Sequence, residues 1–278
     1  MARTERQNNY IELHIKKQMT TTIKKKSLGQ HFLHAKNYLN AVADAAQIKE
    51  GEVVLEIGPG EGALTEVLLK RGAKVIAVEK DTRLIPLLRE KFKNFDISKF
   101  QVVEGDALDF DISTSRNFDI SRDRFAVVGN IPYYITGALF KKFLTAPHQP
   151  STLVFLIQKE VGERIARSKK ESILSLSIKA YGTPKYIKTV PAGAFSPPPK
   201  VDSAILAVED ISRKNFANAA HETKFFELVK KGFSQKRKFL KNNLGPEHSS
   251  ILQKAKIEDK ARAEDVPLEQ WLEISKTS

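Results

Sequence analysis

A glycine-rich turn with two carboxylates is the segment whose residue types point most clearly to chemistry. Gly58, Gly60 and Gly62 follow an apolar run; Glu56 precedes them, and Glu61 stands between Gly60 and Gly62. Glycine adopts positive φ values at little cost and lets a bound ligand approach the backbone closely. A strand that runs into such a turn and then into a helix builds the nucleotide-side crevice of a doubly wound α/β fold.

The charges around this turn bear on which ligand it takes. The spacing Gly58-x-Gly60-x-x-Ala63 also matches the dinucleotide fingerprint, so the turn alone leaves the ligand open, as it does a packing turn that binds nothing. A pyrophosphate would meet the carboxylates of Glu56 and Glu61, whereas a ligand with a sulfonium and an amino group would be attracted to them. This contrast favours S-adenosylmethionine, and with it a methyltransferase.

Two further acids stand where strands are expected to end. Glu79 closes the β-branched run that begins at Lys74, about 20 residues beyond the glycine turn, where a carboxylate accepts hydrogen bonds from ribose hydroxyls. Asp106 follows a third run, and we expect it to accept from the adenine amino group. Either acid alone is more typical of a solvated strand end. Their order along the chain favours a cofactor site.

The tetrapeptide Asn130-Ile131-Pro132-Tyr133 follows a fourth apolar run and bears on the reaction. It is the Asn-Ile-Pro-Tyr form of a motif typical of amino-methyltransferases. Pro132 restricts Ile131 to an extended backbone. The Asn130 amide oxygen and the Ile131 carbonyl can then accept from an exocyclic NH₂, while Tyr133 offers a flat face to a base. A proline turn with a core tyrosine is the alternative for the tetrapeptide alone.

These residues need a scaffold of alternating strands and helices. Strands are expected at 53–57, 74–79, 100–103, 125–129 and 152–157, and helices at 37–47, 82–92 and 137–144. Such alternation predicts a parallel sheet wound on both faces. Two later strands are expected near 186–190 and 203–208. From Lys224 onward the apolar residues recur at helix spacing and no strand is indicated.

The domain organisation follows from these elements and from composition. We expect a flexible basic tail at 1–26, a Rossmann-like methyltransferase domain at 27–209 and a small helical domain at 210–278. The fold class is therefore α/β with a small C-terminal helical domain. In that domain, the segment 230–241 reads as a helix with basic residues around aromatics, either a solvated helix face or a phosphate-binding surface.

Composition narrows the class of partner. The net charge of +13 suits a polyanion such as nucleic acid. The chain has no cysteine, so disulfides, thiolate catalysis and cysteine-ligated metal sites are not expected. It has no apolar stretch long enough to span a membrane, and its start lacks the apolar core of a secretory signal. A cytoplasmic protein is expected.

Several motifs together resemble one known family, the ribosomal RNA adenine dimethyltransferases, and within it the KsgA/RsmA branch. The resemblance spans roughly residues 24 to 270. It rests on Ser27 to Leu33, on Asn130 to Thr136, on Ala194 to Ser203 with its three prolines, and on Arg262 to Asp265. One departure is Lys170-Glu171-Ser172, where the branch often has a Tyr-Gly pair.

The resemblance implies an activity and a set of site residues. It implies S-adenosylmethionine-dependent N6-dimethylation of two adjacent adenosines in a hairpin loop near the 3′ end of small-subunit (16S) rRNA, with a role in small-subunit biogenesis. The expected partner is the small ribosomal subunit. The protein is expected to be a monomer that binds neither a metal nor a membrane. The residues that match the family's cofactor contacts are His31, Leu33, Gly58, Gly60, Glu79, Asp106 and Asn130.

The catalytic set implied by the same resemblance is Asn130, Ile131, Pro132, Tyr133 and Phe195, with Tyr133 and Phe195 as the two aromatic faces that hold the target base. The RNA-binding set is Lys236, Arg237, Lys238 and Lys241. Phe195 as a core residue stays open. Two other functions also stay open: an erythromycin-resistance-type methylase of 23S rRNA, which shares the glycine turn and Asn-Ile-Pro-Tyr, and a non-catalytic ribosome assembly factor.

Overall fold

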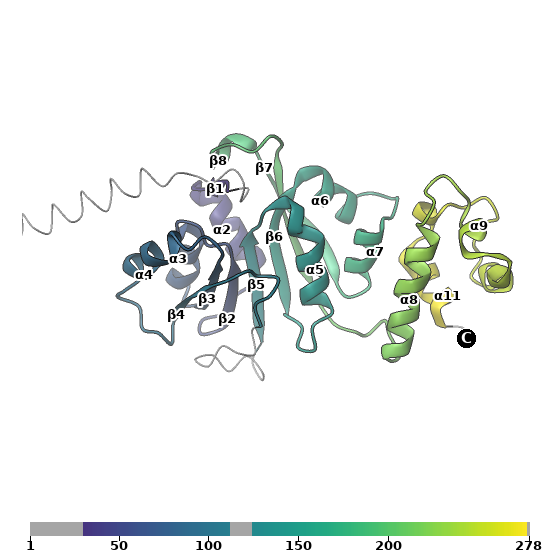
Figure 1. Ribbon diagram of the computed structural model, residues 1–278, viewed down its shortest axis with the longest axis horizontal. Helices are drawn as coiled ribbons and strands as arrows, with labels where there is room; N and C mark the ends of the chain where they lie inside the picture. The colour runs from purple at the N-terminus through teal and green to yellow at the C-terminus, as the bar shows by residue number, and fades with distance from the viewer. Residues whose placement is uncertain (1–29, 112–123, 277–278) are drawn as a thin grey trace, which may run out of the picture. The chain divides into compact units, whose positions relative to one another are not determined.

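The computed structural model describes residues 30–111 and 124–276, so the predicted tail at 1–26 lies outside the described residues. From His31 onward the chain forms one compact unit (Figure 1). Its main sheet has seven strands: β2 (Val53–Ile57), β3 (Lys74–Glu79), β4 (Phe100–Glu104), β5 (Phe125–Asn130), β6 (Thr152–Gln158), β7 (Thr183–Val190) and β9 (Ser203–Glu209). A separate pair of short strands consists of β1 (Phe32–Leu33) and β8 (Phe195–Ser196).

The main sheet is mixed, and its order is β4-β3-β2-β5-β6-β9-β7. The five strands from β4 to β6 pair in parallel, as the alternating pattern predicts. β9 runs antiparallel to both β6 and β7; the sequence pattern gave no direction for these two later strands. The connection from β7 to β9 contains a 3₁₀ turn and β8 but no crossover α-helix, and a parallel return to the same sheet needs a crossover.

Helices cover both faces of the sheet (Figure 1). Alternate residues of each strand point to opposite faces, so Leu55 and Ile76 lie in one core while Val54 and Val75 lie in the other. The first core is covered by α5 (Thr136–Leu144) and α7 (Ile173–Lys179), with α6 (Lys159–Ala166) at its edge. The second core is covered by α2 (Lys36–Ala45), α3 (Ala63–Lys70) and α4 (Leu84–Lys91). Because both faces are buried, the central strands are almost continuously apolar.

After β9 the described chain, up to Lys276, contains helices and no strand. These helices are α8 (Ala219–Gly232), α9 (Leu240–Leu244), α10 (Ser249–Lys254) and α11 (Leu268–Lys276). α8 begins earlier than the predicted Lys224, because the Asn218 side chain accepts a hydrogen bond from the His221 backbone N–H at 2.9 Å and so caps the helix. A fully buried Trp271 packs against α8 at Gly232.

The helical segment shares contacts with the rest of the unit. The Tyr181 hydroxyl donates to Glu222, and Lys170 Nζ donates to Glu264 Oε1 at 2.5 Å. The loop that departs from the family's pattern, Lys170 to Ser172, therefore packs against the Arg262 to Asp265 motif. The apolar core is continuous across residue 210, so the proposed division at that residue remains an interpretation. Among the described residues, no helix is both long and apolar enough to cross a membrane.

Candidate active site

The carboxyl ends of four parallel strands meet at one edge of the sheet. Ile57 at the end of β2 pairs in register with Val78 of β3 and with Gly129 of β5. Glu79 pairs with Glu104 at the end of β4. The glycine turn, Glu79, the loop that carries Asp106 and the Asn-Ile-Pro-Tyr segment therefore all follow strand ends at this edge.

The glycine turn has the conformation that its residues predict. Gly58, Gly60 and Gly62 have φ values of 66°, 58° and 77°, in the left-handed region that favours glycine. The space is also restricted, because a Cβ atom on Gly60 would lie 2.8 Å from the Phe32 ring. The Gly58 N–H donates to the Val78 carbonyl at 2.9 Å, which fixes the turn to the end of β3.

Glu79 lies at the predicted position, at the end of β3, and its side chain also binds the backbone of the glycine turn. One carboxylate oxygen accepts from the Gly60 backbone N–H at 3.1 Å, and the other accepts from the Asp81 N–H at 2.8 Å. The side chain is buried, and burial raises the pKa of Glu79 above its usual range. This structural role was not evident from the sequence. Its predicted contact with ribose hydroxyls stays a prediction.

Asp106 begins the loop after β4 and is held from two directions. Its Oδ2 accepts from Lys80 Nζ at 2.7 Å and its Oδ1 from the Leu108 N–H at 2.9 Å. The hydrogen bond from Lys80 is the main reason that the pKa of Asp106 lies below its usual range. Lys142 of α5 also holds this loop, because its Nζ donates to the Leu108 carbonyl at 2.7 Å. Asp106 is therefore an ionised hydrogen-bond acceptor on a loop that is fixed by hydrogen bonds.

The Asn-Ile-Pro-Tyr segment is fixed at both ends. Asn130 Nδ2 donates to the His31 carbonyl at 2.6 Å, which leaves Oδ1 as the acceptor end of the amide. Pro132 has φ −58° and ψ 133°, and the Ile131 side chain is buried. The Tyr133 hydroxyl shares a 2.7 Å hydrogen bond with Ser203 Oγ, and burial raises the pKa of Tyr133.

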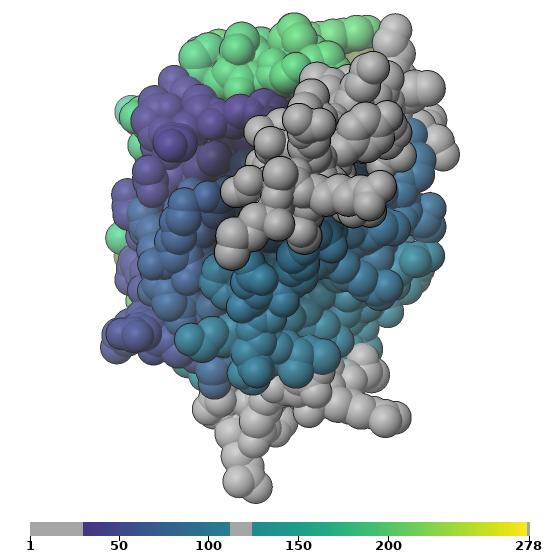
Figure 2. Space-filling view, turned by 90° about the vertical axis from the view of Figure 1, so that its left-hand side faces the viewer, coloured from purple at the N-terminus to yellow at the C-terminus, as the bar shows by residue number. Residues whose placement is uncertain are grey.

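The short β1–β8 pair brings two distant segments to this site. Leu33 pairs with Phe195, and His31 Nδ1 lies 2.8 Å from the Pro197 carbonyl oxygen. Figure 2 shows the purple segment at the start of the described chain beside the green segment that includes β8. Phe195 is only 5% exposed and belongs to the core beside Leu33. A ring that stacks on a base needs an exposed face, so the proposed base contact of Phe195 stays a prediction.

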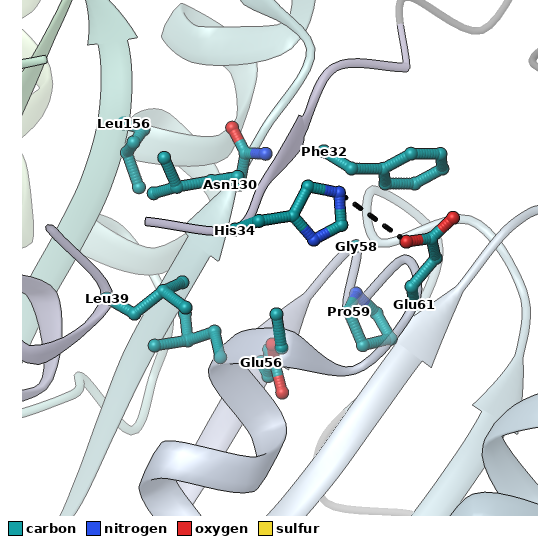
Figure 3. A pocket seen from close by; sticks show the side chains of 12 residues that line it. Phe32, His34, Leu39, Glu56, Gly58, Pro59, Glu61, Asn130 and Leu156 are labelled. Atoms are coloured by element: carbon teal, nitrogen blue, oxygen red, sulfur yellow. Dashed lines mark ion pairs between the residues drawn. The ribbon is translucent and has the colours of Figure 1, made fainter. Parts of the chain in front are cut away.

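A pocket opens between the glycine turn and β1 (Figure 3). Three of the predicted cofactor residues line it, namely Leu33, Gly58 and Asn130. The other lining residues are Phe32, His34, Leu39, Glu56, Pro59, Glu61, Ala63, Leu64 and Leu156. His34 points towards Glu61, and their Nε2 and Oε2 atoms are 3.6 Å apart. His31, Gly60, Glu79 and Asp106 do not line this pocket.

Comparison with known proteins shows which family the chain belongs to. The model of the family described as ribosomal RNA adenine dimethylase matches residues 21–278. The chain belongs to that family. Among its relatives, ribosomal RNA small subunit methyltransferase A of Dehalococcoides mccartyi (strain CBDB1) is 40% identical over 259 residues, which cover 90% of this chain and 87% of the relative. The protein of the same name from Bacillus pumilus (strain SAFR-032) is 36% identical, with 90% of each chain covered.

Solved structures agree on the fold. The crystal structure of the 23S rRNA methyltransferase ErmE has a TM-score of 0.72 and 28% identity, and the match covers 88% of this chain and 98% of ErmE. A dimethyladenosine transferase from Plasmodium falciparum also gives a TM-score of 0.72, at 24% identity, over 88% of this chain and 96% of that protein. The Rossmann-like α/β methyltransferase fold predicted from the sequence is confirmed.

In this dimethylase, Glu56 is the carboxylate most changed by its surroundings. It is 1% exposed and accepts a 2.6 Å hydrogen bond from the Thr65 hydroxyl. Burial, with a smaller contribution from repulsion by Glu79, raises the pKa of Glu56 from 4.5 to about 7. Near neutral pH, Glu56 is therefore close to half ionised. A cationic group in the pocket would favour its ionised form.

The raised pKa predicts a pH-dependent stability. Between pH 4.5 and about 7, folded Glu56 keeps a proton that the unfolded chain releases, so the free energy of unfolding falls as the pH rises. Glu56→Gln mimics the protonated form and should escape this loss. Each pKa unit corresponds to about 1.4 kcal/mol, so the variant should gain up to about 3 kcal/mol on the wild type between pH 4.5 and pH 8.

Urea unfolding at several pH values measures this difference directly. The matched control is Glu61→Gln, which removes a carboxylate from the same turn and leaves Glu56 in place. Parallel pH profiles for the wild type and Glu56→Gln would show that Glu56 titrates in its ordinary range.

The basic segment after α8 is a loop, so the prediction that it is helical was wrong. α8 ends at Gly232 and α9 begins at Leu240, with Lys236, Arg237 and Lys238 exposed between them. At the break, the Gly232 carbonyl accepts a hydrogen bond from Asn243 Nδ2 at 2.5 Å in place of a further helical N–H. The Trp271 ring packs beside Gly232, where a Cβ atom would lie 2.4 Å from it. Lys241, on α9, pairs with Asp259 at 2.9 Å.

Proposed function

We propose that the enzyme uses S-adenosylmethionine to dimethylate N6 of two adjacent adenosines in a hairpin loop near the 3′ end of small-subunit (16S) rRNA, and that it thereby takes part in small-subunit biogenesis. The observation that carries the chemistry is the orientation of the Asn130 amide. Its nitrogen donates to the His31 carbonyl, so its oxygen is the end available to an amino group. The names of the 36% and 40% identical relatives support the small subunit as the substrate.

The residues of the edge suit S-adenosylmethionine. The Phe32 ring leaves room at Gly60 for no side chain, so the turn keeps its backbone close to a bound molecule. Glu56 and Glu61 line the pocket and would attract the cationic sulfonium and amino groups. At the ends of the next two strands, Glu79 and Asp106 are acceptors for the ribose and the adenine amino group. When bound, the cofactor supplies an electrophilic methyl group.

The protein's part in the reaction is to position and polarise the target amine. The lone pair of adenine N6 is delocalised into the ring, which makes the nitrogen a poor nucleophile. Two acceptors, Asn130 Oδ1 and the Ile131 carbonyl, would hold both amino hydrogens and favour a more tetrahedral nitrogen as positive charge develops. No general base is required in this scheme, because the proton can leave to solvent.

The aromatic residue of the motif would hold the base itself. The Tyr133 hydroxyl is fixed to Ser203, so the ring has one orientation and little entropy left to lose. A base can reach this ring only from a loop or after leaving its stack. A hairpin loop meets that requirement, and Phe195 is the proposed second aromatic face. With ribosomal subunits as the proposed substrate, we expect the enzyme to act in the cytoplasm. We also expect a monomer.

Transfer of labelled methyl groups tests the proposed substrate. The protein is incubated with labelled S-adenosylmethionine and with separated small and large ribosomal subunits that lack the modification, and the modified base is mapped. Label at adjacent adenosines of the small subunit is expected. Label on the large subunit would support the erythromycin-resistance type of activity, and subunit binding without any label would support an assembly factor.

The exposed loop between α8 and α9 is the proposed phosphate-binding surface. Within the described chain no acidic side chain lies within ion-pair distance of Lys236, Arg237 or Lys238. Neutralising all three to Gln should weaken binding to small subunits and flatten its salt dependence. Each lost phosphate contact should reduce the log–log salt slope by roughly 0.7 to 0.9, or about 2 to 3 for three contacts.

A second triple variant provides the matched control. Neutralising Arg89, Lys93 and Lys99 removes the same charge from α4 and the turn that follows it. Only the variant in the loop should lose salt dependence beyond the general effect of net charge, and neither should change the affinity for S-adenosylmethionine. Equal salt slopes in the two variants would move the RNA surface elsewhere.

A further inference from the structure

Tyr134 stands apart from the rest of the Asn-Ile-Pro-Tyr segment because its ring is in solvent. It is 71% exposed, whereas Ile131 is 2% exposed and Tyr133 is partly buried. A tyrosine this exposed contributes little to folding, although its apolar face is a large contact surface. Its position, one residue beyond the tyrosine proposed to hold the target base, suggests a role in binding.

The backbone that presents this ring is fixed. Tyr134 lies in the single 3₁₀ turn Tyr133–Ile135, and the Ile135 N–H donates to the Pro132 carbonyl at 3.2 Å. On one side, the Tyr133 hydroxyl is bound to Ser203; on the other, buried Thr136 begins α5. Ordering this segment around a ligand would cost little, because the fold has already ordered it.

A charge on the same side of the sheet favours a nucleotide over an apolar partner. Lys80 follows the end of β3 as Tyr134 follows the end of β5, and the Lys80 ammonium group lies 2.7 Å from Asp106 Oδ2. The Lys80 side chain is 58% exposed, so it can also meet a phosphate from solvent. Stacking on an aromatic ring next to a cation is how proteins hold single-stranded nucleic acid without reading its sequence.

We propose that Tyr134 is the stacking platform for the RNA base that neighbours the target adenosine. The inference rests on the proposed function, since it assumes that the target enters beside Tyr133. Holding the neighbouring base on Tyr134 would keep the strand unstacked and offset part of the cost of presenting the target. The adenine of the cofactor is the other purine that could reach this edge. We favour the RNA base because Tyr134 shares one 3₁₀ turn with Tyr133, the residue proposed to hold the target.

Substitution at Tyr134 tests the proposal on small ribosomal subunits that lack the modification. Loss of one stacked base costs about 1–3 kcal/mol, so Tyr134→Ala should raise the dissociation constant and KM for subunits by about 5- to 160-fold. Tyr134→Phe keeps the ring and should stay within about twofold of the wild type. Calorimetry should give the same affinity for S-adenosylmethionine in all three proteins.

Ile97→Ala is the matched control, because Ile97 is 64% exposed and precedes β4. It therefore lies at the amino ends of the parallel strands, whereas Tyr134 lies at their carboxyl ends. The control variant should leave both affinities unchanged. If Tyr134→Ala binds subunits as the wild type does while the wild type methylates them, the stacking role is refuted and the proposed function stands. Weakened S-adenosylmethionine binding in Tyr134→Ala would assign the ring to the cofactor and overturn the inference. A wild type inactive on small subunits would overturn the proposed function and this inference with it.

Discussion

Asn130→Ala should lower turnover by at least about 10²-fold, the scale of losing one preorganised polar contact to the developing charge. The Asn130 amide is preorganised because its nitrogen is bound to the His31 carbonyl at 2.6 Å. Alanine removes the acceptor that would face the target amine and leaves the glycine turn intact. Single-turnover methylation of small subunits measures the loss. Calorimetry with S-adenosylmethionine should show an affinity within a few-fold of the wild type.

Tyr133→Phe is the natural comparison for Asn130→Ala. It removes the hydrogen bond to Ser203 but keeps the ring that would stack on the base, so turnover should fall by far less. Asn130→Ala also removes a donor from the His31 carbonyl, and thermal unfolding of both variants shows whether that contact matters for stability. Turnover near the wild-type rate in pure Asn130→Ala would rule out the proposed role.

The strand-end residues could be predicted because parallel strands obey a simple geometric rule. Short β-branched runs, each followed by an acid, a glycine or Asn130, predict strands whose carboxyl ends meet at one edge. The structure agrees, because Ile57 at the end of β2 pairs in register with Val78 of β3 and with Gly129 of β5. Local sequence is enough here, since the position of each polar residue depends only on where its own strand ends.

The pocket's other walls depend on contacts between distant segments, so local patterns could not reveal them. β1 and β8 have two residues each, too few for any periodicity, and 162 positions separate Leu33 from its partner Phe195. Their pairing brings Phe32 over Gly60. Local periodicity also missed the interruption of the helix expected across 230–241. There Gly232, the last residue of α8, packs against Trp271 of α11, which is distant in sequence.

Glu79→Ala should combine two losses, which makes it the more severe change at the cofactor side. The Gly60 and Asp81 N–H groups lose their acceptor in a buried position, at about 1–3 kcal/mol each. The turn that should cradle the cofactor is then no longer fixed, and the proposed ribose contact is lost as well. We expect the dissociation constant for S-adenosylmethionine to rise by about 10²-fold or more and the protein to unfold more easily, with RNA affinity less affected.

Glu104→Ala is the matched control, because Glu104 is the register partner of Glu79 on β4 and its side chain is exposed. It should bind S-adenosylmethionine as the wild type does. To separate the ribose contact from support of the turn, Glu79→Ala and the wild type are each titrated with S-adenosylhomocysteine and with its 2′-deoxy analogue. If Glu79 accepts from the ribose, removing the hydroxyl should weaken binding to the wild type and cost Glu79→Ala little more. Equal losses of affinity in both proteins would show that Glu79 only supports the turn. Another residue would then have to bind the ribose.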